Sequence, residues 1–326
     1  MTEKGVMIME KKIEDCTADE FIKLCFADDR DDFWKNFKIR QEDNFVGIYY
    51  KKGKCILPDM DSCNYTLYMY HQFLWNRQCM IFKRRNIKNI PFVTMSEGNL
   101  GLNIDKKDIN LGSDSFISIY WHYKDMQDVI EKIKIETDNE QYQDALKEIE
   151  KIDVSLKEKR QFDEEYFKSD WKKFIWLYLQ KSNTIGGFIV FPRNPASINT
   201  ERGNRYGKIR DRFDLTLECI RRYYEYPEKS EKNDHYNPLF RVLQKDAKFF
   251  EMFGTGREGF QNYIVFFYLQ NWVKQGQVLD LCKNEETLEK WNFNDNPLPT
   301  KKNWWTFYRN IMDRLKERND LIKMSL

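Results

Sequence analysis

The segment from residue 186 to residue 224 places an apolar run, a polar loop and an amphipathic pattern directly after one another. Residues 188–191 are all apolar and lie between a Gly-Gly pair and Pro192, which predicts a short buried strand between breakers. Beyond the loop, apolar side chains recur at helical spacing, at Phe213, Leu217, Ile220 and Tyr224. We therefore expect a strand, a loop and a helix, with any functional surface at their junction.

Helical periodicity recurs in much of the remaining chain. It predicts helices at about residues 17–37, 64–75, 166–180, 238–250, 258–274 and 301–323. The last of these places Trp304, Tyr308, Ile311 and Leu315 on one stripe, which is typical of a helix that faces a core. The charged stretch 124–165 predicts a pair of solvated helices, whereas the polar residues 227–238 predict a loop.

Strand patterns are shorter and fewer. Alternating aromatic and polar residues over 45–55, with Gly53 inside, predict a strand and a turn. Two further short strands are expected between Leu100 and Trp121, where glycines interrupt apolar residues. Together these elements indicate an α+β fold that is predominantly α-helical with a few short strands. No repeat or Pro/Gly/Ser-rich linker divides residues 1–326, so we expect a single domain, with 136–165 as the weakest place for a boundary.

The charges of the chain nearly cancel, because 54 Lys and Arg face 52 Asp and Glu, for a net charge of +2. This balance argues against a chain-wide attraction to nucleic acid or to an anionic membrane, so any such attraction must be local. Seven cysteines without a Cys-x-x-Cys pair are typical of reduced thiols, and the three histidines are not spaced for a metal motif. With no signal peptide and no run of about 20 apolar residues, we expect a cytoplasmic protein that does not involve a membrane.

The loop between the expected strand and helix is locally basic. Residues 193–212 contain six Arg or Lys against two carboxylates, which leaves a local charge of +4. Guanidinium forks bind phosphate or carboxylate, and glycines before a helix N-terminus let backbone N–H groups approach such a ligand. The spacing matches neither a Walker loop nor a Gly-x-Gly-x-x-Gly motif. The candidate ligand-binding residues of the loop and helix are Arg193, Asn199, Arg202, Arg210 and Arg222.

Acidic side chains around the start of the expected helix are the candidates for catalysis. Asp211 and Glu218 lie opposite the apolar stripe, and Asp214 lies on one flank. Because Leu215 makes the helix apolar on both sides, we expect an enclosed helix whose carboxylates are partly desolvated and held by arginines, as acids, bases or metal ligands often are. The alternative is a structural network, in which i,i+4 pairs such as Glu218 with Arg222 neutralise each other.

A further candidate catalytic residue is His71, which lies in an aromatic-rich segment and can act as an acid or base near neutral pH. A lone histidine in such surroundings is more often a structural residue held by hydrogen bonds. The sequence has no Ser-His-Asp order and no Gly-x-Ser-x-Gly elbow, so hydrolysis by a serine triad is set aside.

Motifs spread over most of the chain resemble those of an uncharacterised bacterial family, known only as a domain of unknown function. The family pattern reads D-x-D-S…TL…YH-x-x-LW, Gly…SDS, TIGG…FP, IN-x-x-RG, I-x-DRFDLTLECIRR-x-Y and FF-x-LQ. These motifs lie at Asp59–Ser62 with Tyr70, His71, Leu74 and Trp75, and at Ser113–Ser115, Thr184–Gly187, Ile198–Gly203, Ile209–Tyr224 and Phe266–Gln270. The chain departs from the pattern at Asn64 and Tyr65, where Ser-Pro is expected, and at Arg210. The resemblance implies one shared architecture and no particular reaction.

Two functional hypotheses follow from these patterns. The first is a cytoplasmic bacterial protein that binds a phosphorylated ligand, a nucleotide or a nucleic acid, through the arginine-rich loop, with hydrolysis or phosphoryl transfer by the adjoining carboxylates if it is an enzyme. The second is a non-catalytic interaction or inhibitor protein whose abundant aromatic residues form part of a surface for a protein partner. A role in phage defence or its counter-measures is a hypothesis about context that suits either, and no cofactor is specified.

Overall fold

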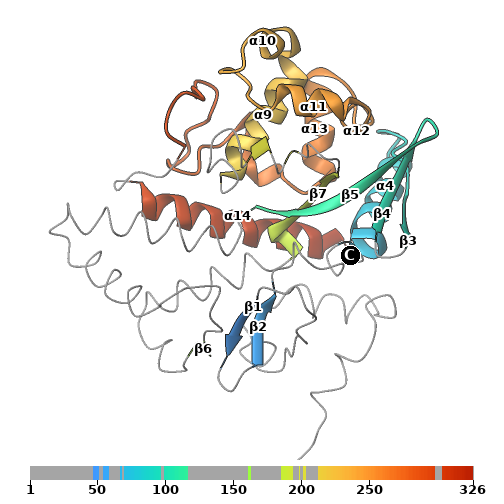
Figure 1. The fold of residues 1–326 in the computed structure, drawn as a ribbon, viewed down its shortest axis with the longest axis horizontal. Coiled ribbons are helices and arrows are strands. Elements are labelled where there is room, and N and C mark those ends of the chain that lie inside the picture. Colours follow the sequence, from blue (N-terminus) through green and yellow to red (C-terminus); the bar gives the residue numbers. More distant parts are fainter. Residues whose placement is uncertain are drawn as a thin grey trace, which may run out of the picture.

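The computed structural model describes helices and small sheets that together confirm the α+β class with a majority of helix. Figure 1 shows their arrangement. The residues that the structure describes are 47–50, 54–58, 67, 70–96, 99–116, 161–162, 185–193, 198, 201–202, 212–297 and 303–325. The helices predicted at 17–37 and 166–180 lie outside these residues.

The largest sheet among the described residues has four strands in the order β3–β4–β5–β7, and each neighbouring pair is antiparallel. Its strands are β3 Val93–Ser96, β4 Asn99–Ile104, β5 Lys107–Ser115 and β7 Phe188–Pro192. A tight turn joins β4 to β5 at Asp105 and Lys106, whose φ angles of +50° and +64° are those of a two-residue hairpin. The strand predicted at 188–191 is confirmed as β7, and all five of its residues are buried.

The last helix, α14 (Trp304–Ser325), anchors the start of β7. The buried guanidinium of Arg318 donates to the carbonyl oxygens of Ile185 at 3.1 Å, Gly186 at 2.8 Å and Phe188 at 2.7 Å. The backbone N–H of Gly186 in turn donates to Oδ1 of Asn319 at 2.7 Å. The short 3-10 turn before β7, Ile185–Gly187, is therefore bonded directly to the helix.

A second group of helices follows β7 and packs together on one side of β5 in Figure 1, with α14 on the other side. They are α9 Phe213–Glu225, α10 Pro227–Lys232, α11 Phe240–Lys245, α12 Ala247–Glu251 and α13 Gly256–Phe266. A 3-10 turn, Gln270–Trp272, and a short hairpin of β8 (Val273–Lys274) and β9 (Gln277–Val278) come after α13.

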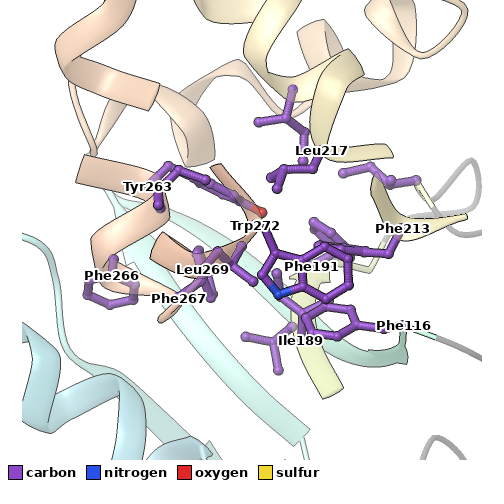
Figure 2. Packing of buried hydrophobic residues seen from close by; sticks show 14 of the residues in the cluster. Phe116, Ile189, Phe191, Phe213, Leu217, Tyr263, Phe266, Phe267, Leu269 and Trp272 are labelled. Carbon is purple, nitrogen blue, oxygen red and sulfur yellow. The ribbon is translucent and has the colours of Figure 1, made fainter. Parts of the chain in front are cut away.

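The sheet and these helices share an aromatic core, in which Trp272 is central (Figure 2). Its indole lies 5.2 Å from the ring of Phe213 on α9 and 5.3 Å from the ring of Phe116 at the end of β5, measured between centroids. The Phe116 and Phe213 rings are themselves 3.9 Å apart. The apolar stripe predicted for the 213–224 helix is confirmed, because all four of its members are buried in this core.

An aromatic-rich helix precedes the sheet and supports its outer strand. A π-helical turn, Tyr70–Trp75, continues into α4 (Asn76–Arg84), so the helix predicted at 64–75 extends further than its pattern indicated. The side chain of Asn76 accepts from the Val93 N–H at 2.8 Å and donates to the Val93 carbonyl oxygen at 3.2 Å. The helix ends where Asn86 takes a φ of +52° and the Ile87 N–H bonds back to the Phe82 carbonyl oxygen, a Schellman ending.

A smaller sheet joins β1 Gly47–Tyr50, β2 Lys54–Pro58 and β6 Gln161–Phe162. β1 is antiparallel to β2 and parallel to β6. The strand predicted at 45–55 is confirmed by β1, whereas the turn predicted at Gly53 lies outside the described residues. The strand at 161–162, however, lies in the charged stretch for which helix was predicted.

Several other predicted elements differ in the structure. The polar segment 227–238 is not only loop, because Pro227 occupies the first turn of α10, where its missing N–H costs nothing. The helix predicted at 238–250 divides at Asp246 into α11 and α12. The helix predicted to reach residue 274 ends at Phe266, where Tyr268 has a φ of +55°. β3 was not predicted, and Gly101 and Gly112 lie inside strands.

Replacing Gly186 with alanine tests the contact between β7 and α14. A Cβ on Gly186 would lie 2.7 Å from Cγ of Asn319 and 2.9 Å from the backbone carbonyl oxygen of Leu315, so the helix must shift. We expect Gly186→Ala to lower the free energy of unfolding by about 1–3 kcal/mol in urea titrations. Gly112→Ala is the matched control, since its Cβ would meet only ordinary contacts at 3.4 Å or more. Equal stability of the two variants would contradict the close packing.

Candidate functional site

The helix α9, which carries the candidate carboxylates, is enclosed by the rest of the protein. Its polar residues Asp214, Glu218, Arg221 and Arg222 are buried together with its apolar ones. This outcome confirms the expectation drawn from Leu215, whose apolar side chain is also fully buried. A helix buried on both sides must satisfy each of its charges internally.

The first ion network forms around Arg212, immediately before α9. Its guanidinium makes a two-pronged contact with Asp214, from Nε to Oδ1 at 2.8 Å and from Nη2 to Oδ2 at 2.6 Å. Nη2 also donates to Oδ1 of Asp280 at 3.0 Å, and Nη1 donates to the Pro297 carbonyl oxygen at 2.8 Å. The Leu281 N–H donates to Asp214 Oδ2 at 3.0 Å. The network therefore fixes the 280–297 segment to the start of α9.

The second network surrounds Glu218. Arg221 donates to both of its carboxylate oxygens at 2.8 Å, and Nε of Arg222 donates to Oε1 at 2.6 Å. The Arg222 guanidinium continues to the carbonyl oxygens of Tyr236 at 2.7 Å and Trp291 at 2.9 Å. The i,i+4 pair of Glu218 with Arg222, predicted from the sequence, is thus present in the core of the protein.

All four oxygens of Asp214 and Glu218 accept hydrogen bonds from buried partners. Burial alone would lower the pKa of Arg212 and of Arg221, but the carboxylates beside them outweigh it and raise both pKa values. The pKa of Asp280 is raised, first by burial and then by the charge of Asp214. Proton transfer or metal binding by these carboxylates would require breaking the contacts that hold α9, so the arrangement corresponds to the structural network.

The arginines of the loop are separated by the fold. Arg202 is fully buried and pairs with Asp114 of β5, with its guanidinium carbon 5.8 Å from the centre of the Phe213 ring. Arg193 is exposed just after β7, where its N–H donates to the Asn110 carbonyl oxygen at 2.6 Å. Arg202 and Arg222 therefore lie in the core and not on a surface that a ligand can reach.

The remaining candidates do not join these networks. Asn199, Arg210 and Asp211 lie outside the described residues. His71 is half-buried on the π-helical turn before α4, and burial lowers its pKa below the ordinary value. Of the predicted site residues that the structure describes, Asp214 and Glu218 belong to two separate networks, and Arg193 and His71 belong to neither.

Three cysteines are buried free thiols: Cys79, Cys219 and Cys282. Burial raises the pKa of Cys79 and of Cys282 to about 12, and it also raises the pKa of Cys219. A thiol must ionise to act as a nucleophile or a metal ligand, so these three are inert near neutral pH. The part of the chain that the structure describes contains no group of three or more His, Cys, Asp or Glu placed to hold a metal ion.

The sequence analysis missed a group of cations at the end of α4. Its members are exposed, and no ion pair joins them to another described residue: Lys83, Arg84, Arg85 and Lys88. The available signal was the absence of any Asp or Glu from residue 62 to residue 96. Other exposed lysines form ion pairs with carboxylates, such as Lys248 with Asp105 and Lys274 with Glu285.

The comparisons with known proteins identify a family without an assigned activity. Residues 35–161 and 150–322 match the model of a family of unknown function, DUF6994, so the chain belongs to that family. Searches of curated proteins and of solved structures found no match. Within the described residues, no helix has both the length and the apolar character that crossing a bilayer requires.

Removing one carboxylate tests whether the α9 networks are structural. We expect Asp214→Asn to lower the free energy of unfolding by about 3–5 kcal/mol in urea titrations, because Arg212 would keep its buried charge without its main partner. Glu317→Gln is the control, since its pair with Arg314 is exposed and contributes about 0–1 kcal/mol. Similar stability of the two variants would show that the buried pairing does not hold the fold together.

The pKa of His71 leads to a prediction about acid stability. Because the pKa is lowered from 6.5 by burial, the unfolded chain takes up the proton at a higher pH than the folded protein does. Stability should therefore fall as the pH drops below about 6.5 and towards the lower folded pKa. Thermal unfolding across this range should be less sensitive to pH in His71→Gln than in the variant of the exposed His235, His235→Gln. Identical profiles for the two variants would contradict this.

Proposed function

We propose that this member of a family of unknown function binds a nucleic acid through exposed cations at the end of α4, and that it does not catalyse a reaction on that nucleic acid. The proposal keeps the phosphate-bearing ligand expected from the sequence and places its binding on another surface. The observation that carries it is the basic cluster, defined as Lys83, Arg84, Arg85 and Lys88, which is exposed and forms no ion pair with any described residue.

The end of a helix offers a structural explanation for part of this cluster. Cations in the last turn interact favourably with the helix dipole and its free carbonyl groups. Lys83 and Arg84 lie in that turn. Arg85 is the C-cap and adjoins the same free carbonyl groups, whereas Lys88 lies beyond the left-handed residue Asn86 and outside the last turn. The dipole thus accounts for three of the four cations and not for Lys88.

The spacing of the basic cluster favours a polymer over a single nucleotide. All four residues are exposed at the helix end and in the segment that follows it, so they form an open surface and not an enclosed phosphate site. A nucleic acid presents a repeating row of phosphates, and binding releases the counterions condensed on that row. Because the whole chain has a net charge of only +2, this local excess of positive charge would direct the polymer to one surface.

The buried networks of α9 are the reason to propose binding without chemistry. Asp214 and Glu218 were the candidates for an acid, a base or a metal ligand. Their carboxylate oxygens, however, accept hydrogen bonds from Arg212, Arg221 and Arg222. The interaction or inhibitor hypothesis has less support among the described residues, where the large exposed apolar side chains are Met80, Phe92, Tyr226 and Met324. Single exposed apolar residues on separate elements are normal for a monomer.

Neutralising the basic cluster should weaken nucleic-acid binding and its dependence on salt. In fluorescence anisotropy with a labelled 20-nucleotide single strand, we expect the wild type to bind more weakly as salt rises. The variant Lys83→Gln, Arg84→Gln, Arg85→Gln, Lys88→Gln should show a slope of log affinity against log salt that is shallower by about 3, since each phosphate contact contributes about 0.7.

The control variant removes the same number of charges from exposed lysines elsewhere: Lys232→Gln, Lys245→Gln, Lys290→Gln and Lys316→Gln. It should retain the slope of the wild type. If both variants lose affinity equally, attraction is diffuse and the proposed surface is incorrect. If the wild type does not bind single or double strands at low salt, the function itself is rejected.

A further inference from the structure

The sheet β3–β4–β5–β7 has one face that remains open over its first three strands. One row of paired residues runs across this sheet: Thr94 of β3 is opposite Gly101 of β4, and Gly101 is opposite Asn110 of β5. The row ends at Arg193, just after β7, whose N–H donates to the Asn110 carbonyl oxygen. Side chains directly opposite one another in antiparallel strands share a face. Thr94, Asn110 and Arg193 are exposed, so this row crosses the sheet on its solvent side.

The composition of this face opposes strand formation. The outward positions of β4 and β5 that flank and include the row carry amides and glycines, together with one carboxylate: Asn99, Gly101, Asn103, Asn110, Gly112 and Asp108, which accepts from Nδ2 of Asn103 at 2.6 Å. Asparagine and glycine are depleted in strands, where Thr, Val or Tyr would be favoured at solvated positions. A solvated sheet face requires polar side chains, but residues that favour strands, such as Thr, would meet this requirement as well. The face therefore combines a cost to the strands with a surface rich in hydrogen-bonding amides.

The two glycines keep the middle of this face flat. A Cβ on Gly101 would lie 3.3 Å from Oγ1 of Thr94, and a Cβ on Gly112 would lie 3.4 Å from Cδ of Arg193. The neighbouring side chains thus lie across the positions that larger residues would occupy. Gly101 and Gly112 are therefore only partly exposed, because the side chains of Thr94 and Arg193 lie against them.

An aromatic ring borders the open face. Phe92, immediately before β3, is 51% exposed, whereas Val93 after it is buried. Strand side chains alternate between faces, so Phe92 lies on the same side as Thr94. The carbonyl oxygen of Pro91 accepts from Sγ of Cys79 at 3.4 Å. Cys79 precedes Lys83 and Arg84 by four and five residues on α4, or about 6–8 Å along its axis, so the backbone next to Phe92 is bonded to α4 about one turn before the basic cluster.

We infer that the open face of this sheet binds the unpaired bases of a single-stranded nucleic acid, with Phe92 as the stacking residue. This inference rests on the proposed function and specifies its ligand. The basic cluster would hold phosphates at one border of the face, and Arg193 would hold them at the other. The amide of Asn110 can both donate and accept hydrogen bonds, as base edges require, whereas the amide of Asn103 already donates from Nδ2 to Oδ1 of Asp108 at 2.6 Å.

The dimensions and chemistry of the face fit a single strand better than a duplex. Neighbouring strands lie about 4.8 Å apart, so the row from Thr94 to Arg193 spans about 14 Å, enough for two or three bases. Base stacking on an aromatic ring requires an exposed base surface, which a duplex covers. Charge also opposes a purely apolar partner, because cations lie at two borders of the face.

Substitution of Phe92 separates stacking from charge. In the full chain, Phe92→Ala should lower the affinity for a labelled 20-nucleotide single strand by about 5- to 150-fold, the loss of one stacked base, with an unchanged salt slope. Phe92→Trp should restore the affinity. An abasic 20-mer, which keeps the phosphates, should bind wild type and Phe92→Ala equally. Met324→Ala is the control for loss of an exposed apolar side chain, since Met324 is 78% exposed.

The outcomes distinguish this inference from the proposed function. If Phe92→Ala binds single strands as the wild type does, while neutralising the basic cluster still weakens binding, the sheet face is rejected and the proposed function stands. Preference of the wild type for duplex would also reject the sheet face. Binding to anionic phospholipid vesicles without binding to any oligonucleotide would reject both.

Discussion

The burial of arginine side chains is the constraint on which the rest of this structure depends. Arg202, Arg212, Arg222 and Arg318 are all nearly inaccessible to solvent. A guanidinium carries five N–H donors and a permanent charge, so its burial is tolerated only where carboxylates and carbonyl oxygens surround it. Here those groups come from distant parts of the chain. Arg318 binds carbonyls around residues 185–188 and 267, and Arg222 binds carbonyls at 236 and 288–291, so each arginine joins segments that are distant in the sequence.

This constraint separates polarity from function in the charged segment that leads into and includes α9. A segment with many arginines and carboxylates is typical of an anion site, but the same groups can satisfy one another when the helix beneath them is apolar on two sides. In α9 the second arrangement occurs, and Asp214 and Glu218 are positioned by the cations that neutralise them. The cations free to meet a ligand are then those of the surface, where pairing is incomplete, and the end of α4 is such a place among the described residues.

Features that depend on near neighbours in sequence were predicted well. Breakers around an apolar run identified β7, and helical spacing identified α9, its enclosure and the pair of Glu218 with Arg222. The β4–β5 turn was not predicted, because Asp105 and Lys106 adopt left-handed angles without the glycine that usually signals such a turn. The burial of Arg202 and Arg222 also escaped prediction, since their partners other than Glu218 lie between 14 and 88 residues away. Sequence patterns report local periodicity, whereas the exposure of a charge is decided by tertiary contacts.

A core held by charge networks changes what the sheet must contribute to stability. The buried arginines and the aromatic cluster around Trp272 join β7 to α9 and α14, so the inner end of the sheet is fixed independently of its outer strands. Its outer edge is held by Asn76 through both backbone groups of Val93. Because the outer strands β3 and β7 are both held by contacts with helices, β4 and β5 can carry asparagine and glycine at solvated positions, although these residues form strands poorly. Residues retained against local propensity are expected where a surface has another task. The open face is therefore the place where selection for folding alone explains the sequence least.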